Sequence, residues 1–269
     1  MTKLYLIGSL KNPEIPKIAK GLRNLNFEVF DEWYAAGPEA DDYWRDYENF
    51  NGHSYAQALK GYPAKHVFTF DQFHLNCAHS GILVYPAGKS GHLELGFLSG
   101  QKKPCFILLD KIPDRFDVMK QFAQNIYTNI ENLIEDLSNY PWPKFPEMPI
   151  LYQHQIMWLA GLLEGEGSFC ISKNTPRLCL QMTDPDIVEQ AADILKSSVW
   201  SSKRLTKGDK RVYACGKAGL SAIEWMRILK PYLGIRRQQQ ITTTVSIWLE
   251  NRKYNSKDNS FWATMFGIK

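Results

Sequence analysis

Hydrophobic positions in the first half of the chain alternate between short continuous runs and helical spacing. Five apolar runs predict strands, at 3–8, 27–30, 67–70, 80–86 and 104–109. Helices are predicted between them, at 13–26, 41–59, 72–78, 91–100 and 116–137. Strands that are apolar along their length are typical of a parallel sheet covered on both faces. The first half is therefore predicted to be an α/β domain that binds its ligand beyond the carboxyl ends of the strands.

The second half has a different pattern. Helices are expected at 152–163, 184–195, 218–229 and 235–250, with strands at 168–172, 177–182, 199–205 and 211–215. This order predicts an α+β domain with an antiparallel sheet. Between the halves, residues 139–149 hold four prolines, which fix φ and remove donors, so this stretch is expected to be extended. The predicted division is 1–138, a linker at 139–150, and 151–269.

Composition narrows the class of protein. The 269 residues are 44% hydrophobic and 22% charged, which is typical of a globular chain. No apolar run approaches the ~20 residues that cross a membrane, and the N-terminus is too short for a signal sequence. The cysteines are scattered without a Cys-x-x-Cys pair, so neither a disulfide framework nor a zinc site is supported. We expect a cytoplasmic protein with no membrane partner.

Charge is unevenly distributed. The first 149 residues hold 15 Lys and Arg against 18 Asp and Glu, and the other 120 hold 17 against 10. A basic second half is expected to meet a polyanion such as DNA. Ordinary surface charge explains the same count equally well.

Two carboxylates carry the candidate chemistry of the first half. Glu94 is expected in the first turn of a helix that follows the small-residue turn at 86–91, where the helix dipole would keep it ionised. Asp71 is expected after a strand, where a role as a helix cap is the alternative. Carboxylates on separate elements can share the cleavage of a glycosidic bond, one as nucleophile and one at the leaving group.

The segments YLIGSL, EVFDEW, FTFDQFHLNCAHSGILVYPAGKSGHLELGF and GQKKPCFILL resemble the nucleoside 2-deoxyribosyltransferase superfamily, which includes nucleotide N-glycoside hydrolases. The resemblance implies a flavodoxin-like sheet, attack of Glu94 on the anomeric carbon of a (deoxy)ribose, and contact or protonation of the base by Asp71. It implies a nucleoside, nucleotide or nucleobase substrate and no cofactor. The substrate-binding residues would be Gly8, Ser9, Asp31, Trp33, Gly88, Ser90 and Gly91.

Two features of this region leave alternatives open. His79 stands where the superfamily tends to have an aspartate, and packing at a helix end is the interpretation we favour over catalysis. Aromatic residues gather at Tyr43, Trp44, Tyr47, Phe50 and Tyr55. They would either stack on a base or form part of the core.

The segment LAGLLEGEG at 159–167 resembles the LAGLIDADG homing-endonuclease signature, and the likeness extends over most of 151–250. Ala160 and Gly161 would let two such helices cross closely, and a single motif implies a homodimer. Glu166 of each copy would approach a shared site, where paired carboxylates can hold Mg²⁺. The sheet would bind DNA in the major groove through Lys173, Arg177, Lys203, Arg204, Lys207, Lys210 and Arg211. Glu164 and Glu166 replace the usual aspartates, which favours a domain that no longer cleaves DNA and serves in DNA binding or dimerisation.

Three functions follow from these patterns. The first is an N-glycosyl (2-deoxyribosyl) transferase or N-glycosidase with a covalent glycosyl-Glu94 intermediate and a DNA-binding or dimerising module. The alternative is a site-specific LAGLIDADG-type endonuclease with an accessory first domain. The third is a non-catalytic nucleic-acid binder. Replacing Glu94 should abolish only the first activity, and replacing Glu166 only the second.

Overall fold

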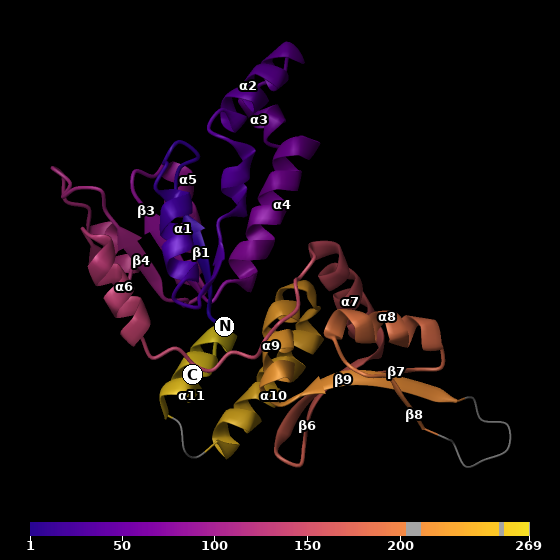
Figure 1. The fold of residues 1–269 in the computed structure, drawn as a ribbon. Helices are drawn as coiled ribbons and strands as arrows, with labels where there is room; N and C mark the ends of the chain where they lie inside the picture. The colour runs from indigo at the N-terminus through magenta and orange to yellow at the C-terminus, as the bar shows by residue number, and fades with distance from the viewer. Residues whose placement is uncertain (203–210, 253–255, 269) are drawn as a thin grey trace. The chain divides into compact units, whose positions relative to one another are not determined.

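The computed structural model describes residues 1–202, 211–252 and 256–268 (Figure 1). It divides into two compact units, Met1–Tyr140 and Pro141–Lys269. The boundary falls directly after helix α6 (Ile130–Asn139), inside the proline-rich stretch. Among the described residues, no helix has the length and apolar character needed to cross a membrane.

A five-stranded parallel sheet forms the centre of the first unit, in the order β2-β1-β3-β4-β5. Its strands are β1 (Lys3–Ile7), β2 (Glu28–Phe30), β3 (Ser80–Val84), β4 (Cys105–Leu108) and β5 (Asn125–Tyr127). In register, Leu6 lies beside Ile82 and Ile82 beside Phe106. All three side chains are buried. The predicted α/β class and the flavodoxin-like strand order are confirmed.

Helices cover both faces of this sheet. The main ones are α1 (Ile15–Arg23), α4 (Tyr62–Cys77), α5 (Lys89–Gly100) and α6. Crossovers between parallel strands are right-handed, so the direction in which the chain moves across the sheet decides which face the connecting helix covers. The chain moves toward one edge from β1 to β2, and toward the other edge from β2 to β3 and from β3 to β4. Therefore α4 and α5 share one face and α1 lies on the other. The core beneath α4 and α5 includes Tyr5, Phe30, Leu75, Leu83 and Leu95.

Two predicted elements in the first unit are wrong. Residues 67–70 were expected as a strand and 72–78 as a separate helix, but 62–77 is one continuous helix, α4. The expected helix at 116–137 is instead a 3-10 helix, η2 (Val118–Phe122), then β5 and α6. Asp117 and Asn129 explain this division, because their side chains accept the backbone N–H of Met119 (3.0 Å) and Asn132 (2.9 Å) and so begin new helices.

The expected helix at 41–59 is divided as well. A 3-10 helix, η1 (Glu32–Ala36), is followed by α2 (Ala40–Phe50) and α3 (Tyr55–Ala58). Gly52 has a φ of +71° after the end of α2, and Ser54 forms a capping box with Gln57 that begins α3. These local signals are stronger than the helical spacing that runs through them.

The second unit contains a four-stranded antiparallel sheet in the order β6-β7-β9-β8. Its strands are β6 (Gly167–Ser172), β7 (Thr175–Met182), β8 (Trp200–Ser202) and β9 (Val212–Ala218). Its helices are α7 (Gln153–Glu166), α8 (Pro185–Leu195), α9 (Gly219–Leu229), η3 (Lys230–Tyr232), α10 (Ile235–Asn251) and α11 (Ser256–Phe266). The predicted antiparallel sheet is confirmed, and α11 was not predicted.

The proline-rich stretch carries no helix or strand over 140–150, as expected. It is nevertheless attached to the second unit through an aromatic cluster. The Phe145 ring lies 5.5 Å from that of Phe261 and 5.6 Å from that of Trp262, which also contacts Trp248. These contacts anchor the segment to α10 and α11.

Candidate functional site

Asp71 lies inside α4, one turn before the core residue Leu75. Its expected position at the strand edge, with the alternative of a helix cap, is therefore wrong. The Oδ1 atom of Asp71 is buried, and no hydrogen-bond partner for it exists among the described residues. Burial raises the pKa of Asp71 to about 6. An unpartnered buried oxygen of this kind is available to a ligand.

Glu94 lies in the second turn of α5, because the helix begins at Lys89 rather than at Gly91. The expected first-turn position, where the dipole acts, is therefore wrong. Burial, and secondly the negative charge of Asp71, raise the pKa of Glu94 to about 8. The pKa of Glu94 is therefore shifted upward, in the direction opposite to the one expected from a helix dipole.

Tyr5 on β1 forms the floor between these two carboxyls. It is 1% exposed, and its ring packs 5.1 Å from that of Phe30. Burial raises the pKa of Tyr5, and the negative charges of Glu94 and Asp71 raise it further. The three groups therefore lie in one region between α4, α5 and the sheet, in which Tyr5 is buried and Glu94 and Asp71 are half-buried.

His74, one turn after Asp71 on α4, is another polar residue of this region. Its ring stacks on Phe30, with centroids 3.8 Å apart and planes 13° from parallel, and Phe70 packs edge-on at 4.6 Å. The Nδ1 atom is buried, again with no hydrogen-bond partner in the described part of the chain. Burial, and secondly the charge of Lys3, lower the pKa of His74 to about 4, so the imidazole is neutral.

The sequence did not indicate Tyr5 or His74 as site residues. Tyr5 lies within the apolar run of β1, so its sequence context indicates a core residue. The three-residue spacing of Asp71 and His74 has meaning only on a helix, and this segment was divided between a strand and a shorter helix. Reading 62–77 as one helix would have placed the two side chains on the same face.

The turn after β1 and the turn after β3 are joined at the carboxyl edge of the sheet. The Asn12 side-chain amide donates to the Tyr85 carbonyl oxygen at 3.1 Å, and Ser9 Oγ accepts the Lys11 backbone N–H at 3.2 Å. A Cβ atom at Gly8 would lie 2.4 Å from Ile15 Cδ1, so a side chain there would displace α1 or that methyl group. Gly8 and Ser9 thus lie at the edge where the sequence predicts ligand binding.

Asp31 and Trp33 follow the edge strand β2. Asp31 forms an ion pair with Arg23, whose guanidinium also donates to the Val29 carbonyl oxygen at 2.9 Å. The Trp33 indole N–H donates to the Leu6 carbonyl oxygen at 2.8 Å, and its ring packs against the core that contains Tyr5. Both side chains are fixed at the same edge as Ser9.

The turn before α5 contains the remaining predicted binding residues. Ser90 is exposed, and the Gly88 carbonyl oxygen is 2.9 Å from His92 Nδ1. Gly91 is buried, and a Cβ there would lie 3.0 Å from both Ile7 Cγ2 and Leu83 Cδ1. A glycine at 91 therefore lets α5, and Glu94 with it, approach the sheet closely.

Lys103 connects the two helices that carry the carboxyls. Its buried ammonium group donates to the carbonyl oxygens of Leu75 (2.7 Å) and Asn76 (2.9 Å) at the end of α4. Gln101, directly after α5, donates to Asn76 Oδ1 at 2.8 Å. The α5–β4 turn thus holds the end of α4 and fixes the helix that bears Asp71.

Two alternatives left open by the sequence can now be resolved. His79 is buried, and its Nδ1 accepts the Lys3 backbone N–H at 2.8 Å, so the favoured packing role is borne out. Of the aromatic residues of α2, Tyr43, Tyr47 and Phe50 are not core, because they are 72%, 58% and 90% exposed, whereas Trp44 is half-buried.

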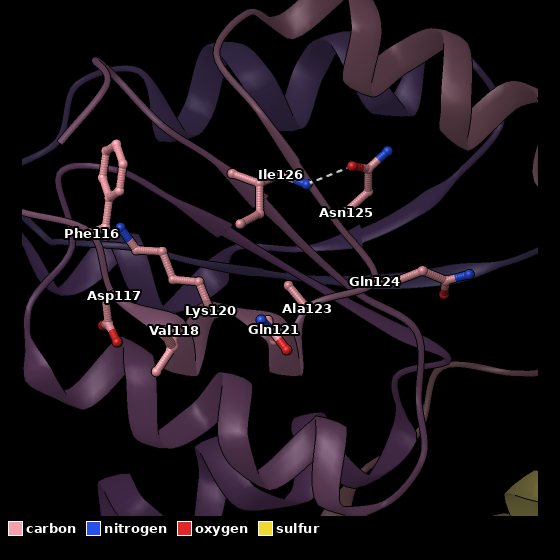
Figure 2. Close-up of a pocket in the computed structure, with 9 residues that line it drawn as sticks. All are labelled: Phe116, Asp117, Val118, Lys120, Gln121, Ala123, Gln124, Asn125 and Ile126. Carbon is pink, nitrogen blue, oxygen red and sulfur yellow. Dashed lines mark hydrogen bonds between the residues drawn. The ribbon is translucent and has the colours of Figure 1, made fainter.

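A hollow of about 380 Å³ lies in the segment before and along β5 (Figure 2), and neither Glu94 nor Asp71 lines it. Figure 2 shows the side chains of Phe116, Lys120 and Ile126 around it, and the Ile126 N–H donates to Asn125 Oδ1 at 2.9 Å. The hollow is wide and shallow, and it contains no residue that the sequence singles out.

In the second unit, Glu164 and Glu166 have different surroundings. The Glu164 carboxylate accepts the Gly234 backbone N–H at 2.9 Å, at the N-terminus of α10. Arg237 donates to the carbonyl oxygens of Glu164 (3.0 Å) and Gly165 (3.1 Å). Glu166, at the end of α7, is exposed. Glu164 is therefore a structural group that joins α7 to α10.

One face of the antiparallel sheet is open, whereas the helices cover the other. Leu178 and Leu180 are buried on the covered face, and the alternate residues of β7 include exposed Arg177 and Gln181. Lys173 is exposed in the β6–β7 turn, and Arg211 is exposed before β9. The other predicted DNA-binding residues, Lys203, Arg204, Lys207 and Lys210, lie outside the described residues.

The described residues of one chain do not fit a metal centre. No three His, Cys, Asp or Glu side chains among them gather at a point where they would hold an ion. Glu166 would supply one carboxylate, and a hard cation needs several oxygen ligands.

No protein-family model and no curated protein matches the sequence. A solved structure of a 2-deoxyribosyltransferase from the psychrotolerant bacterium Bacillus psychrosaccharolyticus is 19% identical, covering 56% of this chain and 100% of that chain with a TM-score of 0.35. The homing endonuclease I-CvuI in complex with its target is 16% identical, covering 44% of this chain and 97% of that chain with a TM-score of 0.28. A second I-CvuI complex, in which the DNA is not cleaved, gives the same values. These are the two kinds of protein that the motifs resemble, but at TM-scores this low neither likeness assigns an activity to this chain.

Proposed function

We propose that the first unit is an N-glycosyl transferase or N-glycosidase that acts on nucleosides, nucleotides or bases in DNA. The observation that carries the proposal is that Glu94, Asp71 and Tyr5 lie in one region between α4, α5 and the sheet, where burial raises the pKa of each group and the charge of Asp71 raises that of Glu94 further. Paired carboxyls whose pKa values are moved apart from each other are typical of acid–nucleophile chemistry. We assign Glu94 as the nucleophile and Asp71 as the acid, as the resemblance implies; because Glu94 has the higher pKa, the proton must move to Asp71 before the attack.

One proton shared by the pair is enough for the reaction. With pKa values of about 8 and about 6, the two carboxyls together hold about one proton at pH 7. When that proton is on Asp71, Glu94 is a carboxylate that can attack C1′ of the sugar. The new bond joins C1′ to a Glu94 oxygen, and the C1′–N bond breaks. Its electron pair goes to the base, which takes the proton from Asp71.

The second step regenerates the pair. A second base, or water, attacks C1′ and displaces the Glu94 carboxylate, and its proton returns to Asp71. The sugar would lie over Tyr5, beside Ser9 and the Gly88–Gly91 turn, because Ser9 follows β1 at the carboxyl edge of the sheet and this turn leads into the helix that carries Glu94. Trp33 and Asp31 border the same edge on the side of β2. No cofactor is needed for either step.

Base exchange tests this proposal. The full chain is incubated with a 2′-deoxynucleoside or deoxynucleotide and an isotope-labelled free base, and the labelled product is measured by mass spectrometry. Glu94→Gln keeps the size of the side chain but has no nucleophilic oxygen anion, so exchange should fall below detection. Glu131→Gln, on the exposed face of α6, is the matched control. Exchange that persists in Glu94→Gln contradicts the assignment.

The second unit is proposed to bind DNA as a dimer. Support comes from its excess of basic residues, from the open sheet face with Arg177, and from α7. On α7, the positions of Gly161 and Gly165 are exposed, with open space where a Cβ would lie. A second α7 can approach closely there. DNA binding should therefore weaken steeply with salt, and binding that does not change with salt contradicts this part.

Endonuclease activity is the alternative, favoured by the exposed carboxylate of Glu166 at the end of α7. Because the described residues of one chain do not gather a set of metal ligands, an Mg²⁺ site would need Glu166 from two copies. Plasmid cleavage in Mg²⁺ that is lost in Glu166→Gln and retained in Glu94→Gln would support this alternative. Base exchange with no cleavage in the wild type would exclude it as the main activity.

A further inference from the structure

A helical arm in the first unit has almost no core of its own. It comprises α2, α3 and the first two turns of α4, residues 39–68, and is named the aromatic arm below. Figure 1 shows α2 and α3 beyond the N-terminal end of α4, away from the strands. Over residues 31–72 only Glu48 and Ala58 are buried. Glu48 is held inside the arm by Trp44 (3.0 Å) and His53 (2.6 Å).

The aromatic arm exposes large side chains. Its most exposed aromatic residues are Tyr43, Tyr47, Phe50, Tyr55, Tyr62 and Phe68, which are 58–90% exposed. An aromatic side chain covers about 150–250 Å², so the exposed area of these six is on the order of 800 Å². A standard interface buries about 800 Å² per partner. Tyr43, Tyr47 and Phe50 are four and three residues apart, so they form one stripe along α2.

Charge on the aromatic arm is divided between its two sides. Glu39, directly before α2, and Asp46 on α2 border the stripe and are exposed. The only basic residue of that helix, Arg45, is paired with Asp42 and Asp46. Lys60 in the turn before α4 and Lys65 in its first turn are exposed as well. The α2 side is therefore acidic and the start of α4 is basic, so the surface is complementary to a copy of itself.

We propose that the aromatic arm binds a second copy of this chain, with α2 of each copy packed on the start of α4 of the other. A two-fold arrangement pairs the two oppositely charged sides twice and covers both aromatic stripes. The acidic border of the stripe disfavours a nucleic acid there, because phosphates would be repelled. This contact is independent of the proposed activity and of self-association through α7.

Charge reversal in the full chain tests the proposal by sedimentation velocity at micromolar concentration. Glu39→Lys with Asp46→Lys makes both sides basic, and Lys60→Glu with Lys65→Glu makes both acidic. Each double variant should dissociate at the arm, with a Kd at least tenfold higher than that of the wild type and a mass about half as large. An equimolar mixture of the two should restore the larger species, because each basic side then meets an acidic one. Glu131→Lys with Glu135→Lys, exposed on α6, is the matched control and should leave the mass unchanged.

The results separate this contact from the alternatives. If α7 also associates, the variants fall from a larger assembly to a dimer, and if it does not, they fall from a dimer to a monomer. An unchanged mass in both double variants overturns the proposal, as expected if another part of the chain or a nucleic acid covers the arm. Dissociation that the mixture fails to reverse also overturns it. Circular dichroism spectra that match the wild type show that the variants are folded.

Discussion

Burial of Glu94 predicts that this carboxyl destabilises the folded chain as the pH rises. Folding raises the pKa of Glu94 from 4.5 to about 8, so between these values the folded state binds more protons than the unfolded state. Stability is then lost progressively as the pH rises from 4.5 to about 8, and is constant above it. One pKa unit corresponds to about 1.4 kcal/mol. The full cost is therefore on the order of 5 kcal/mol, and about 3 kcal/mol of it is present at pH 7.

Glu94→Gln removes this cost, because the amide has a similar shape and does not ionise. The difference in the free energy of unfolding between Glu94→Gln and the wild type should be about 1 kcal/mol at pH 5, about 3 kcal/mol at pH 7 and about 5 kcal/mol at pH 9. The assay is urea unfolding of both proteins at each pH. Glu131→Gln should show no such trend. A difference that stays flat with pH, or a variant that is less stable than the wild type at pH 9, would refute the burial argument.

Other predictions follow from the same contacts. The rate of base exchange in the wild type should have a bell-shaped pH dependence with limbs near 6 and 8, because the carboxyl pair needs one proton. A wild-type rate that rises steadily to pH 10 would contradict the shared proton. In Asp71→Asn the pKa of Glu94 should fall but stay above 4.5. Lys103→Met should lower kcat more than it raises KM, since α4 loses two hydrogen bonds to its last carbonyl groups. If steady-state kinetics give an unchanged kcat, Lys103 does not position Asp71. Glu164→Ala should lower stability by about 1–2 kcal/mol because it removes the acceptor of the Gly234 N–H, whereas Glu166→Ala should have no effect on thermal unfolding. Equal effects would contradict the assignment of these two residues. In a filter-binding titration, Arg177→Ala should lower the slope of log binding constant against log salt concentration by about one phosphate contact. An unchanged slope would show that the open sheet face does not contact DNA.

The sequence predicts most of the fold because the buried strands are continuous apolar runs. β1, β3 and β4 have this pattern, and they set the α/β class of the first unit. The pattern fails where an apolar run does not face the core. Val67, Phe68 and Phe70 have apolar side chains, but all three are exposed on α4. β5 was missed because its three residues lie within a longer stretch of helical spacing.

The candidate site could be predicted only in part for a related reason. Glu94 and Asp71 stand out as carboxylates in apolar surroundings, so the sequence finds them. Their electrostatic state depends on burial between α4, α5 and β1, which is a tertiary property. For this reason the sequence suggests an ionised Glu94, whereas the folded chain gives Glu94 a pKa of about 8. The neutral His74 beside Phe30 depends on the same packing.

The central claim is that Glu94 forms a covalent bond to a sugar. The most direct test is mass spectrometry of the peptide that contains Glu94, after the full chain has been quenched in acid during turnover of 2′-deoxynucleosides, deoxynucleotides or DNA. The account predicts a mass increase of one deoxyribosyl or phosphodeoxyribosyl group on Glu94 that is absent in Glu94→Gln. Release or exchange of a base with no adduct on Glu94 in any of these reactions, or an adduct on another residue, would contradict it.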